Sequence, residues 1–149
     1  MTSTQSENSL PRHTSFGWLI AVLGGQLAAE LDGKLKEIGL NITLWPTLFA
    51  LWEEEGLTQA ELAARCQTAH YTTTRVLDTL EKLELVERRK HPTSRRAYQI
   101  FLTPKGRELE AEGIALARAC NREFLSPLND EESEVLHDLI SRIIHARSS

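Results

Sequence analysis

Apolar residues recur at helical spacing in the first third of the chain. Leucines occupy every fourth position from Leu19 to Leu35, inside a segment that becomes polar towards its end. Residues four apart lie on one face of an α-helix, so the pattern predicts a long amphipathic helix over residues 15–38. A second helix is expected after it, with Thr43 as the N-cap and Pro46 in the first turn, where a missing N–H is harmless.

Two further helices are predicted at the end of the chain. Thr103 is a suitable N-cap, and Pro104 takes the favoured first helical position behind it. Asn129 followed by Glu132 matches a capping box and opens the last helix. The stripe on that helix is broad and consists of Val135, Leu136, Leu139, Ile140, Ile143 and Ile144. A face this apolar needs to be buried, either by the same chain or by a partner chain.

The middle of the chain has the pattern of two short helices. Thr58 and Glu61 match a capping box, and the helix that they open ends near Cys66. Thr68 or Ala69 begins the next helix, which runs to about residue 83. Its inward stripe consists of Thr73, Val76, Leu77, Leu80 and Leu83, and its other face is polar. Two short helices joined by a tight turn predict a helix-turn-helix.

A β-hairpin is predicted directly after the second of these helices. Residues 85–88 are suited to a strand, and the residues from His91 to Ser94 are turn formers. Apolar and polar residues alternate from Tyr98 to Thr103, which is the period of a second strand. The sequence therefore predicts a mainly α protein with a small β-hairpin whose tip spans residues 90–96.

Charge is distributed unevenly along the 149 residues, whose formal net charge is −4. Ten basic and four acidic residues between Arg65 and Arg107 give that segment a charge of +6, which leaves −10 for the rest. A polar helix beside a basic hairpin tip suits duplex DNA, because phosphates dominate the affinity. The residues expected to contact DNA are Tyr71, Thr72, Arg75, Thr79, Lys90, Ser94, Arg95 and Arg96.

Other classes of function find less support in the sequence. The apolar segment 16–31 is shorter than the ~20 residues that span a bilayer, and no signal-peptide pattern surrounds it. There is no glycine-rich phosphate loop and no nucleophile elbow. His137 and His145 are eight residues apart, too far for one metal ion without other ligands. We therefore expect no catalysis, no cofactor and no metal.

The two cysteines, Cys66 and Cys120, lie far apart and form no CxxC pair. This usage is typical of a reducing compartment, so we expect a cytoplasmic protein. Both positions fit small core residues. Redox sensing by either thiol stays open as an alternative, although neither lies in an obvious cationic neighbourhood on a helix N-terminus.

Three segments resemble the MarR family of bacterial winged-helix regulators. They are LTQAELAARC (57–66), TTTRVLDTLEKLELVERR (72–89) and SRRAYQIFLTPKGRELE (94–110). The resemblance implies a winged helix-turn-helix with N- and C-terminal dimerisation helices, acting as a homodimeric repressor or activator on an inverted repeat in DNA. It also implies that Arg75 lies in the recognition helix and Arg96 at the tip of the wing. The alternative function is a winged-helix adaptor that binds proteins without binding DNA.

This chain departs from the family pattern at the wing and after the recognition helix. The wing of the family usually reads Asp-Pro-x-Asp-Arg-Arg, whereas residues 91–96 here read HPTSRR, without either carboxylate. The tip is therefore more basic, and Arg96 is expected to be held less firmly, because Ser94 can accept one hydrogen bond but offers no charge. Glu84 stands where the family commonly has glycine, which predicts an unusual helix end or a strained positive φ.

The resemblance also suggests which segments of the chain form the dimer and which bind DNA. Residues 1–14 are expected to form a flexible N-terminus, residues 15–40 and 104–149 a helical dimerisation lobe, and residues 41–103 the DNA-binding lobe. A small aromatic effector is expected between the lobes, where Trp18, Trp45 and Phe49 offer aromatic walls and Gly24-Gly25 offers space. The alternative is that these aromatic side chains simply fill the core.

Overall fold

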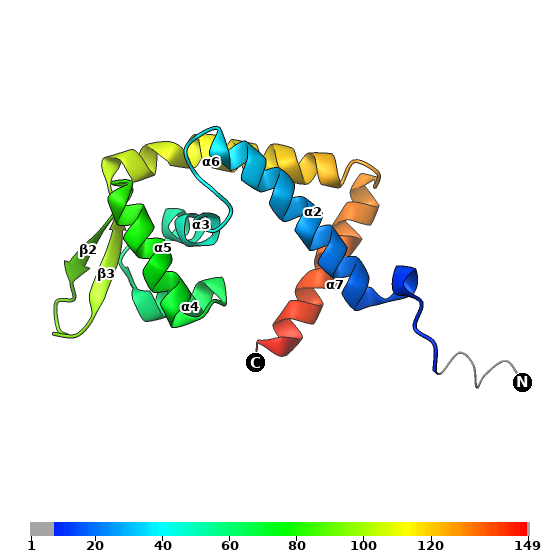
Figure 1. Ribbon diagram of the computed structural model, residues 1–149, viewed down its shortest axis with the longest axis horizontal. Helices are drawn as coiled ribbons and strands as arrows, with labels where there is room; N and C mark the ends of the chain where they lie inside the picture. Colours follow the sequence, from blue (N-terminus) through cyan, green and yellow to red (C-terminus); the bar gives the residue numbers. More distant parts are fainter. Residues whose placement is uncertain (1–7, 149) are drawn as a thin grey trace, which may run out of the picture.

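The computed structural model describes residues 8–148. Figure 1 shows two lobes, with α6 running along the top of both. The elements in chain order are the 3-10 helix η1 (Arg12–Thr14), α2 (Phe16–Lys36), α3 (Trp45–Glu53), β1 (Leu57–Thr58), α4 (Gln59–Cys66), α5 (His70–Lys82), β2 (Val86–Lys90), β3 (Tyr98–Leu102), α6 (Pro104–Phe124) and α7 (Asp130–Arg147). The predicted mainly helical fold with a small hairpin is confirmed.

The hairpin belongs to a three-stranded antiparallel sheet in the order β1-β3-β2. Strands β2 and β3 pair with Val86 opposite Leu102 and Lys90 opposite Tyr98, which leaves residues 91–97 as the wing tip. The short strand β1 was not predicted, since two residues show no alternation. It lies directly before α4 and pairs with β3, so the sheet holds the wing against the helix-turn-helix.

The hydrophobic core fills the lobe made by α3, α4, α5 and the sheet. It consists mainly of leucines, and Leu48, Leu62 and Leu77 are completely buried. Burial of a leucine side chain contributes about 1.5–3 kcal/mol. Leu35 near the end of α2 is part of this core, and Leu109 of α6 packs against it. The two long helices are therefore anchored in the helix-turn-helix lobe before they extend away from it.

Two of the predicted helix starts illustrate how local these signals are. Asn129 and Glu132 form the complete capping box, with Asn129 Oδ1 accepting from Glu132 N at 2.8 Å and Glu132 Oε1 accepting from Asn129 N at 3.0 Å. Thr58 accepts from Glu61 N at 3.2 Å as expected, but Glu61 reaches back to the Thr58 hydroxyl and not to its backbone. Half of that box is thus replaced by a side-chain hydrogen bond.

The start of α3 differs from the prediction. Thr43 is not the N-cap; that position belongs to Leu44, which makes no side-chain cap. Instead Asn41 Oδ1 accepts hydrogen bonds from Thr43 N at 2.9 Å and from Leu44 N at 3.2 Å. The asparagine closes a turn ahead of the helix, a role for which its short amide side chain is well suited. Pro46 lies in the first turn as predicted.

Three helices end in the same way, with a residue of positive φ that follows the last helical turn. These residues are Gly39 after α2 (φ 80°), Gln67 after α4 (φ 53°) and Glu84 after α5 (φ 61°). The closing hydrogen bonds run from Leu40 N to Leu35 O, Thr68 N to Ala63 O and Leu85 N to Leu80 O, at 2.9, 3.0 and 2.9 Å. This is the Schellman motif, which favours glycine at the left-handed position. The turn of the helix-turn-helix therefore closes without glycine, and the expected strain at Glu84 is present.

We expect Glu84→Gly to stabilise the protein by about 1 kcal/mol, because glycine adopts the left-handed conformation without the steric cost that an L side chain carries. The free energy of unfolding from chemical denaturation measures the change. Gly39→Ala is the reverse change in the same motif, at a site with open space around the new Cβ. It should cost a similar amount, and a Glu84→Gly protein no more stable than wild type would contradict the assignment.

The second lobe leaves apolar side chains exposed. No residue of α7 is buried. The exposed large apolar residues of this lobe are Phe16, Trp18, Leu19, Ile20 and Leu23 on α2, and Val135, Leu139, Ile143 and Ile144 on α7. Apolar surface of this extent marks a protein interface. No helix among residues 8–148 has the length and apolar character needed to cross a membrane.

A pair of carboxyl groups bridges α2 and α6. A hydrogen bond with the Glu123 carboxyl raises the pKa of Glu30 above its ordinary value, and desolvation raises it further. The folded state therefore holds this proton more tightly than the unfolded chain does. The stabilisation is complete below the ordinary pKa of glutamate, ~4.3, and is lost as the pH rises through the elevated folded pKa.

Above the elevated folded pKa, ionised Glu30 makes the folded state less stable relative to the unfolded chain. Glu30→Gln removes this destabilisation. The variant should melt at a higher temperature than wild type at pH 7, and the difference should shrink as the pH falls towards 4. Thermal denaturation across that range measures it, with Glu112→Gln, an exposed glutamate on α6, as the matched control. An unchanged difference between pH 7 and pH 4 would argue against carboxyl sharing.

Candidate nucleic-acid interface

The outer face of α5 gathers the four helix residues that the sequence singles out. Tyr71 is 70% exposed, Arg75 and Thr79 are exposed, and Thr72 is half-buried. All four line one hollow of about 370 Å³ between α5 and the turn that precedes α3. The inward stripe from Thr73 to Leu80 fixes the rotation of the helix and so turns this face outward. The Thr79 hydroxyl donates to Arg75 O at 3.1 Å, which leaves the guanidinium as the strongest free donor on the face.

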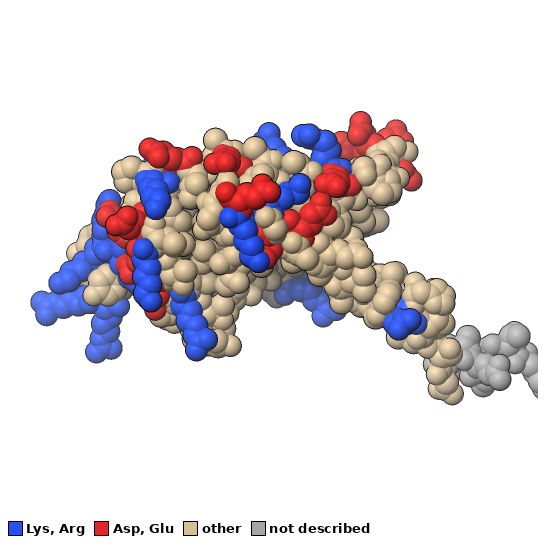
Figure 2. Space-filling view, turned by 45° about the horizontal axis from the view of Figure 1, so that its top comes forward, with Lys and Arg blue, Asp and Glu red and all other residues tan. Residues whose placement is uncertain are grey.

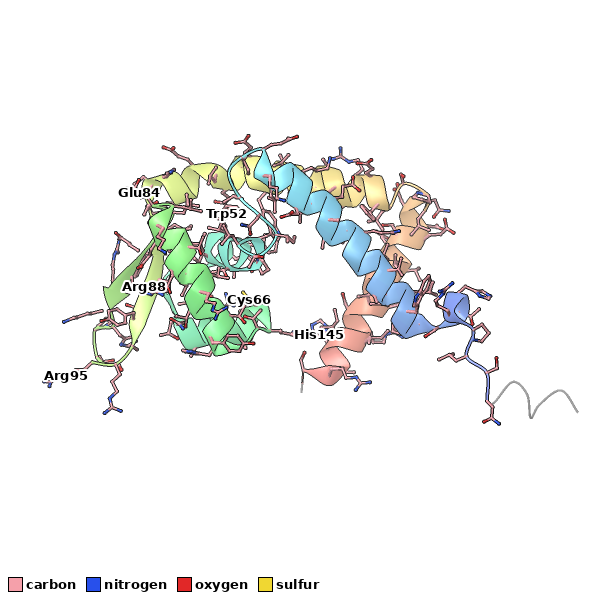
Figure 3. All side chains as sticks on the ribbon, viewed as in Figure 1. Trp52, Cys66, Glu84, Arg88, Arg95 and His145 are labelled. Carbon is pink, nitrogen blue, oxygen red and sulfur yellow. The ribbon has the colours of Figure 1, made fainter. Side chains whose placement is uncertain are left out.

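The wing tip and the adjoining end of β2 carry the other predicted residues. Lys90, Arg95 and Arg96 are exposed, and Ser94 is half-buried. Figure 3 shows Arg95 at the far end of the hairpin, away from the rest of the molecule. Lys90, Ser94 and Arg95 border one hollow of the tip, of about 390 Å³. Arg96 instead borders a hollow of about 240 Å³ beside the starts of α4 and α5. The cations of the wing therefore lie on two different sides of it.

His91 organises the turn at the wing tip. Its Nδ1 atom accepts hydrogen bonds from Thr93 N and from Ser94 N, both at 3.2 Å, and lies 3.2 Å from the Thr93 hydroxyl. Among residues 8–148, no hydrogen bond joins Ser94 to Arg96. The His91 Nδ1 atom closes this turn in the way that the side-chain oxygen of an aspartate closes an Asx turn. The sequence signal for this turn was the histidine at position 91, since a neutral imidazole offers one acceptor nitrogen.

Ion pairs neutralise several of the ten basic side chains between Arg65 and Arg107, so fewer of them remain available to bind a polyanion. Arg88 is held by two carboxylates of α5, with Nη1 at 2.7 Å from Glu81 Oε2 and Nη2 at 3.0 Å from Asp78 Oδ1. Arg89 pairs with Glu87, and its guanidinium carbon lies 4.1 Å from the centre of the Phe101 ring. In the described part of the segment, the cations without a carboxylate partner are Arg75, Lys82, Lys90, Arg95, Arg96 and Lys105.

These cations share one end of the molecule. Figure 2 shows Lys and Arg side chains projecting from the end that carries the hairpin and α5, while carboxylates gather along α6 and at the start of α7. Arg88 lies between β2 and α5 (Figure 3), so it joins the wing to the helix. The surface can therefore offer a polyanion one helix face and one basic tip at a fixed separation.

Two polar residues at the same end were not predicted. Gln59 at the start of α4 contacts the Thr74 hydroxyl and lies 3.4 Å from His70 Nδ1. His70 begins α5, whose N-terminus has no side-chain cap. Both residues border the hollow that Arg96 also lines. Polar residues at the first positions of both short helices were the available sequence signal, because helix N-termini are among the groups with which proteins contact DNA phosphates.

Burial makes both cysteine thiols less acidic, and the two histidines of α7 are bonded to their own helix. Desolvation by burial raises the pKa of the Cys66 thiol and of the Cys120 thiol, which lowers the fraction of reactive thiolate. The rings of His137 and His145 each donate to the carbonyl four residues earlier, at 2.7 and 2.8 Å. Within residues 8–148, no three His, Cys, Asp or Glu side chains are grouped as metal ligands.

The aromatic residues suggested for an effector pocket are partly separated. Trp45 stacks on Phe49 with ring centres 5.5 Å apart and meets Trp52 edge-on at 5.6 Å. Trp18 lies at the start of α2, remote from α3, with its ring centre 5.3 Å from the Arg12 guanidinium carbon. Phe49 borders a hollow of about 380 Å³ together with Cys66. Trp45 and Trp52 also pack against Gly113, so much of the aromatic surface fills space within the chain.

Known proteins share this arrangement. The MarR family model matches residues 40–98. The chain is 31% identical over 123 residues to the uncharacterized HTH-type transcriptional regulator YsmB of Bacillus subtilis, covering 80% of this chain and 84% of that protein. It is 30% identical over 121 residues to the transcriptional repressor MprA of Escherichia coli, covering 80% and 69%. The crystal structure of a probable transcriptional regulator from Pseudomonas aeruginosa, 30% identical, matches with a TM-score of 0.82 over 89% of this chain and 99% of that one. The chain therefore belongs to the MarR family of transcriptional regulators.

Proposed function

We propose that the protein is a sequence-specific double-stranded DNA-binding repressor that acts as a homodimer on an inverted repeat. The observation that carries the proposal is the position of its unpaired cations. Most of them lie on α5 or on the wing, with Lys105 at the start of α6, while other arginines of the same segment are neutralised by carboxylates. A protein-binding adaptor is less well supported, because it gains nothing from phosphate-compatible charge on both elements.

In this proposal α5 enters the major groove and the wing reaches the neighbouring backbone. Tyr71, Thr72 and Arg75 read base edges from the helix, and Thr79 lies beside them. The planar guanidinium of Arg75 is suited to a bidentate contact with guanine. Arg96 borders the minor groove, and Lys90 and Arg95 contact phosphates, which set the register without reading sequence.

The second copy of the chain would cover the apolar surface of α2 and α7. A two-fold dimer places two α5 helices on one side, and the half-sites of its DNA then lie about 10 bp apart, one helical turn. Residues 15–40 and 104–149 supply the dimer lobe in this proposal, and residues 41–103 the DNA-binding lobe. Repression is proposed because the relative MprA is a transcriptional repressor, and a transcriptional regulator of this kind works in the cytoplasm.

Selection of bound duplexes from a random 30-bp library tests the function. The expected product is an inverted repeat, bound by a particle whose protein mass in sedimentation is that of two chains. A selected pool without a shared sequence, bound no better than the starting library, would contradict sequence-specific recognition. A monomer on a single half-site would contradict the proposed dimer alone.

Two arginines should separate sequence reading from charge. Arg75→Ala should cost ~1–3 kcal/mol on the selected duplex and much less on random DNA, because a base contact is lost. Arg95→Ala should weaken both duplexes alike and flatten the salt dependence of binding by about one unit, because one phosphate contact is lost. Titration across a salt series measures both, with Arg118→Ala on α6 as the control. Equal affinity and slope in all three variants would remove these arginines from the interface.

We also propose a small aromatic acid as effector, near Trp45 and Phe49; Trp18 is too far from this pair to line the same site. Phe49 is 41% exposed beside a hollow, and Gly24 and Gly25 face open space on α2. Such a ligand acts only through different affinities for the DNA-competent and incompetent states. A panel of aryl acids added to the preformed complex tests it. Release from wild type, but not from a folded Phe49→Ala protein, is expected; no release by any compound would oppose the proposal.

A further inference from the structure

One hydroxyl group joins the end of the recognition helix α5 to the start of α6. Thr103 Oγ1 accepts from Gly106 N at 3.1 Å and so caps α6. The same hydroxyl donates to Glu84 O at 2.6 Å, directly after α5. Thr103 N donates to Leu85 O at 3.0 Å. A single residue therefore satisfies backbone groups at two helix ends that would otherwise lack partners.

The neighbours of Thr103 strengthen this junction. Lys105 Nζ donates to Leu83 O at 3.1 Å, where a cation also meets the negative end of the α5 dipole. The carbonyls of residues 83, 84 and 85 are thus all bonded to residues 103–105. Gly106 lies so close that an added Cβ would be 2.2 Å from Leu85 O. Trp52 Nε1 also donates to Gly106 O at 3.0 Å from the other side.

The junction has a mechanical consequence because α6 is continuous. It runs as one helix from Pro104 to Phe124 and packs along α2 in the other lobe. Figure 1 shows the end of α5 meeting α6 at the far end of the first lobe, while the opposite end of α6 reaches α7. A rotation of α6 is therefore transmitted to the recognition helix through the contacts of residues 103–106.

We infer that Thr103 is a positioning residue that fixes the angle between α5 and α6 and thereby sets the half-site spacing that the dimer accepts. The spacing part rests on the proposed function, whereas the angle is a property of one chain. Neither role involves contact with DNA, since Thr103 lies at the end of α5 that is opposite to His70.

Three substitutions separate the two hydrogen bonds of the hydroxyl. Thr103→Ser keeps both. Thr103→Asp keeps the acceptor for Gly106 N and is a favoured N-cap, but it has no proton to donate to Glu84 O. Thr103→Val loses both bonds at nearly constant shape. A role limited to capping α6 predicts that Asp behaves as wild type, and the positioning role predicts that Asp behaves as Val.

The first measurement compares affinities for the duplex selected by the wild type and for the same duplex with one base pair inserted at its centre. One inserted pair turns a half-site by roughly 35°, so wild type and Thr103→Ser should prefer the original duplex about tenfold or more. In Thr103→Asp we expect this preference to fall to about threefold or less, because a loosened α5 can follow the displaced half-site. A wild-type preference in Thr103→Asp would overturn the inference about spacing.

The second measurement needs neither DNA nor a dimer. Spin labels at Tyr71→Cys, near the end of α5 remote from the junction, and at Arg122→Cys on α6, in a Cys66→Ala/Cys120→Ala chain diluted with unlabelled protein, report the distance between the two helices. A narrow distribution is expected for wild type and Thr103→Ser, and a broader one for Thr103→Asp and Thr103→Val. Equal widths in all four would overturn the positioning role even if DNA binding is confirmed. Broadening in a protein that selects no DNA would leave the positioning role standing and refute the proposed function.

Discussion

Replacing Gly106 by alanine should destabilise the protein by about 3 kcal/mol or more, because the new methyl group has no space that a side chain can vacate. The added Cβ would lie 2.2 Å from Leu85 O and 3.1 Å from Leu85 C, which are backbone atoms. Leu85 itself is 2% exposed in the core and follows the strained Glu84. Relief therefore requires α6 to move away from the end of α5, with loss of the contacts around Thr103 and Trp52.

Thermal denaturation should show a fall in midpoint of about 10 °C for a chain of this size. Gly33→Ala is the matched control, since Gly33 lies within α2 and nothing is within 4 Å of its added Cβ. Alanine should stabilise that exposed helical site by about 0.5–1 kcal/mol. A Gly106→Ala protein with the stability of wild type would show that α6 does not approach Leu85 as closely as described.

Replacing Arg88 by alanine should weaken DNA binding about 10- to 100-fold, although Arg88 is not expected to touch DNA. The change removes one positive charge and exposes the carboxylates of Asp78 and Glu81 beside the recognition face. Like charge then faces the phosphates, and the wing loses its link to α5. Stability should change little, by about 1 kcal/mol, because ion pairs of partly exposed groups contribute modestly.

Two comparisons separate the causes of that loss. Arg88→Ala combined with Asp78→Asn and Glu81→Gln removes the repulsion and keeps the wing unlinked, so the affinity it recovers measures the charge effect. A double-mutant cycle with Arg95→Ala measures the link, since Arg95 should contribute less when the wing is free to move. Full recovery in the triple variant, with no coupling to Arg95, would show that Arg88 acts through charge alone.

The start of a helix could be predicted from the sequence where its capping residues lie within the first turn of that helix. The caps at Thr58, Thr103 and Asn129 form within three residues of sequence, so residue type and spacing suffice. The same holds for the outward face of α5, because the buried stripe leaves only one orientation for Arg75. Thr43 failed as a cap because Pro46, three residues later, has no N–H to donate to its hydroxyl, while Asn41 closes the turn ahead of the helix.

The charge of the candidate surface was only partly predictable. The count of +6 between Arg65 and Arg107 indicated a basic region. It did not indicate that Arg88 is committed to carboxylates seven and ten residues earlier, or that Arg107 pairs with Glu55 across 52 residues. Which guanidinium meets which carboxylate depends on the packing of α5, β2 and α6, and sequence spacing within one element carries no information about it.

The sequence by itself determined the helices, the hairpin, the polar face of α5 and the cations of the wing tip, because each depends on neighbours a few residues away. Only the tertiary structure decided the pairing of β1 with β3, the commitment of Arg88 and the junction at Thr103. Those features join backbone and side-chain groups from different elements, from seven to more than forty residues apart. Their partners are fixed only when the core brings the elements together.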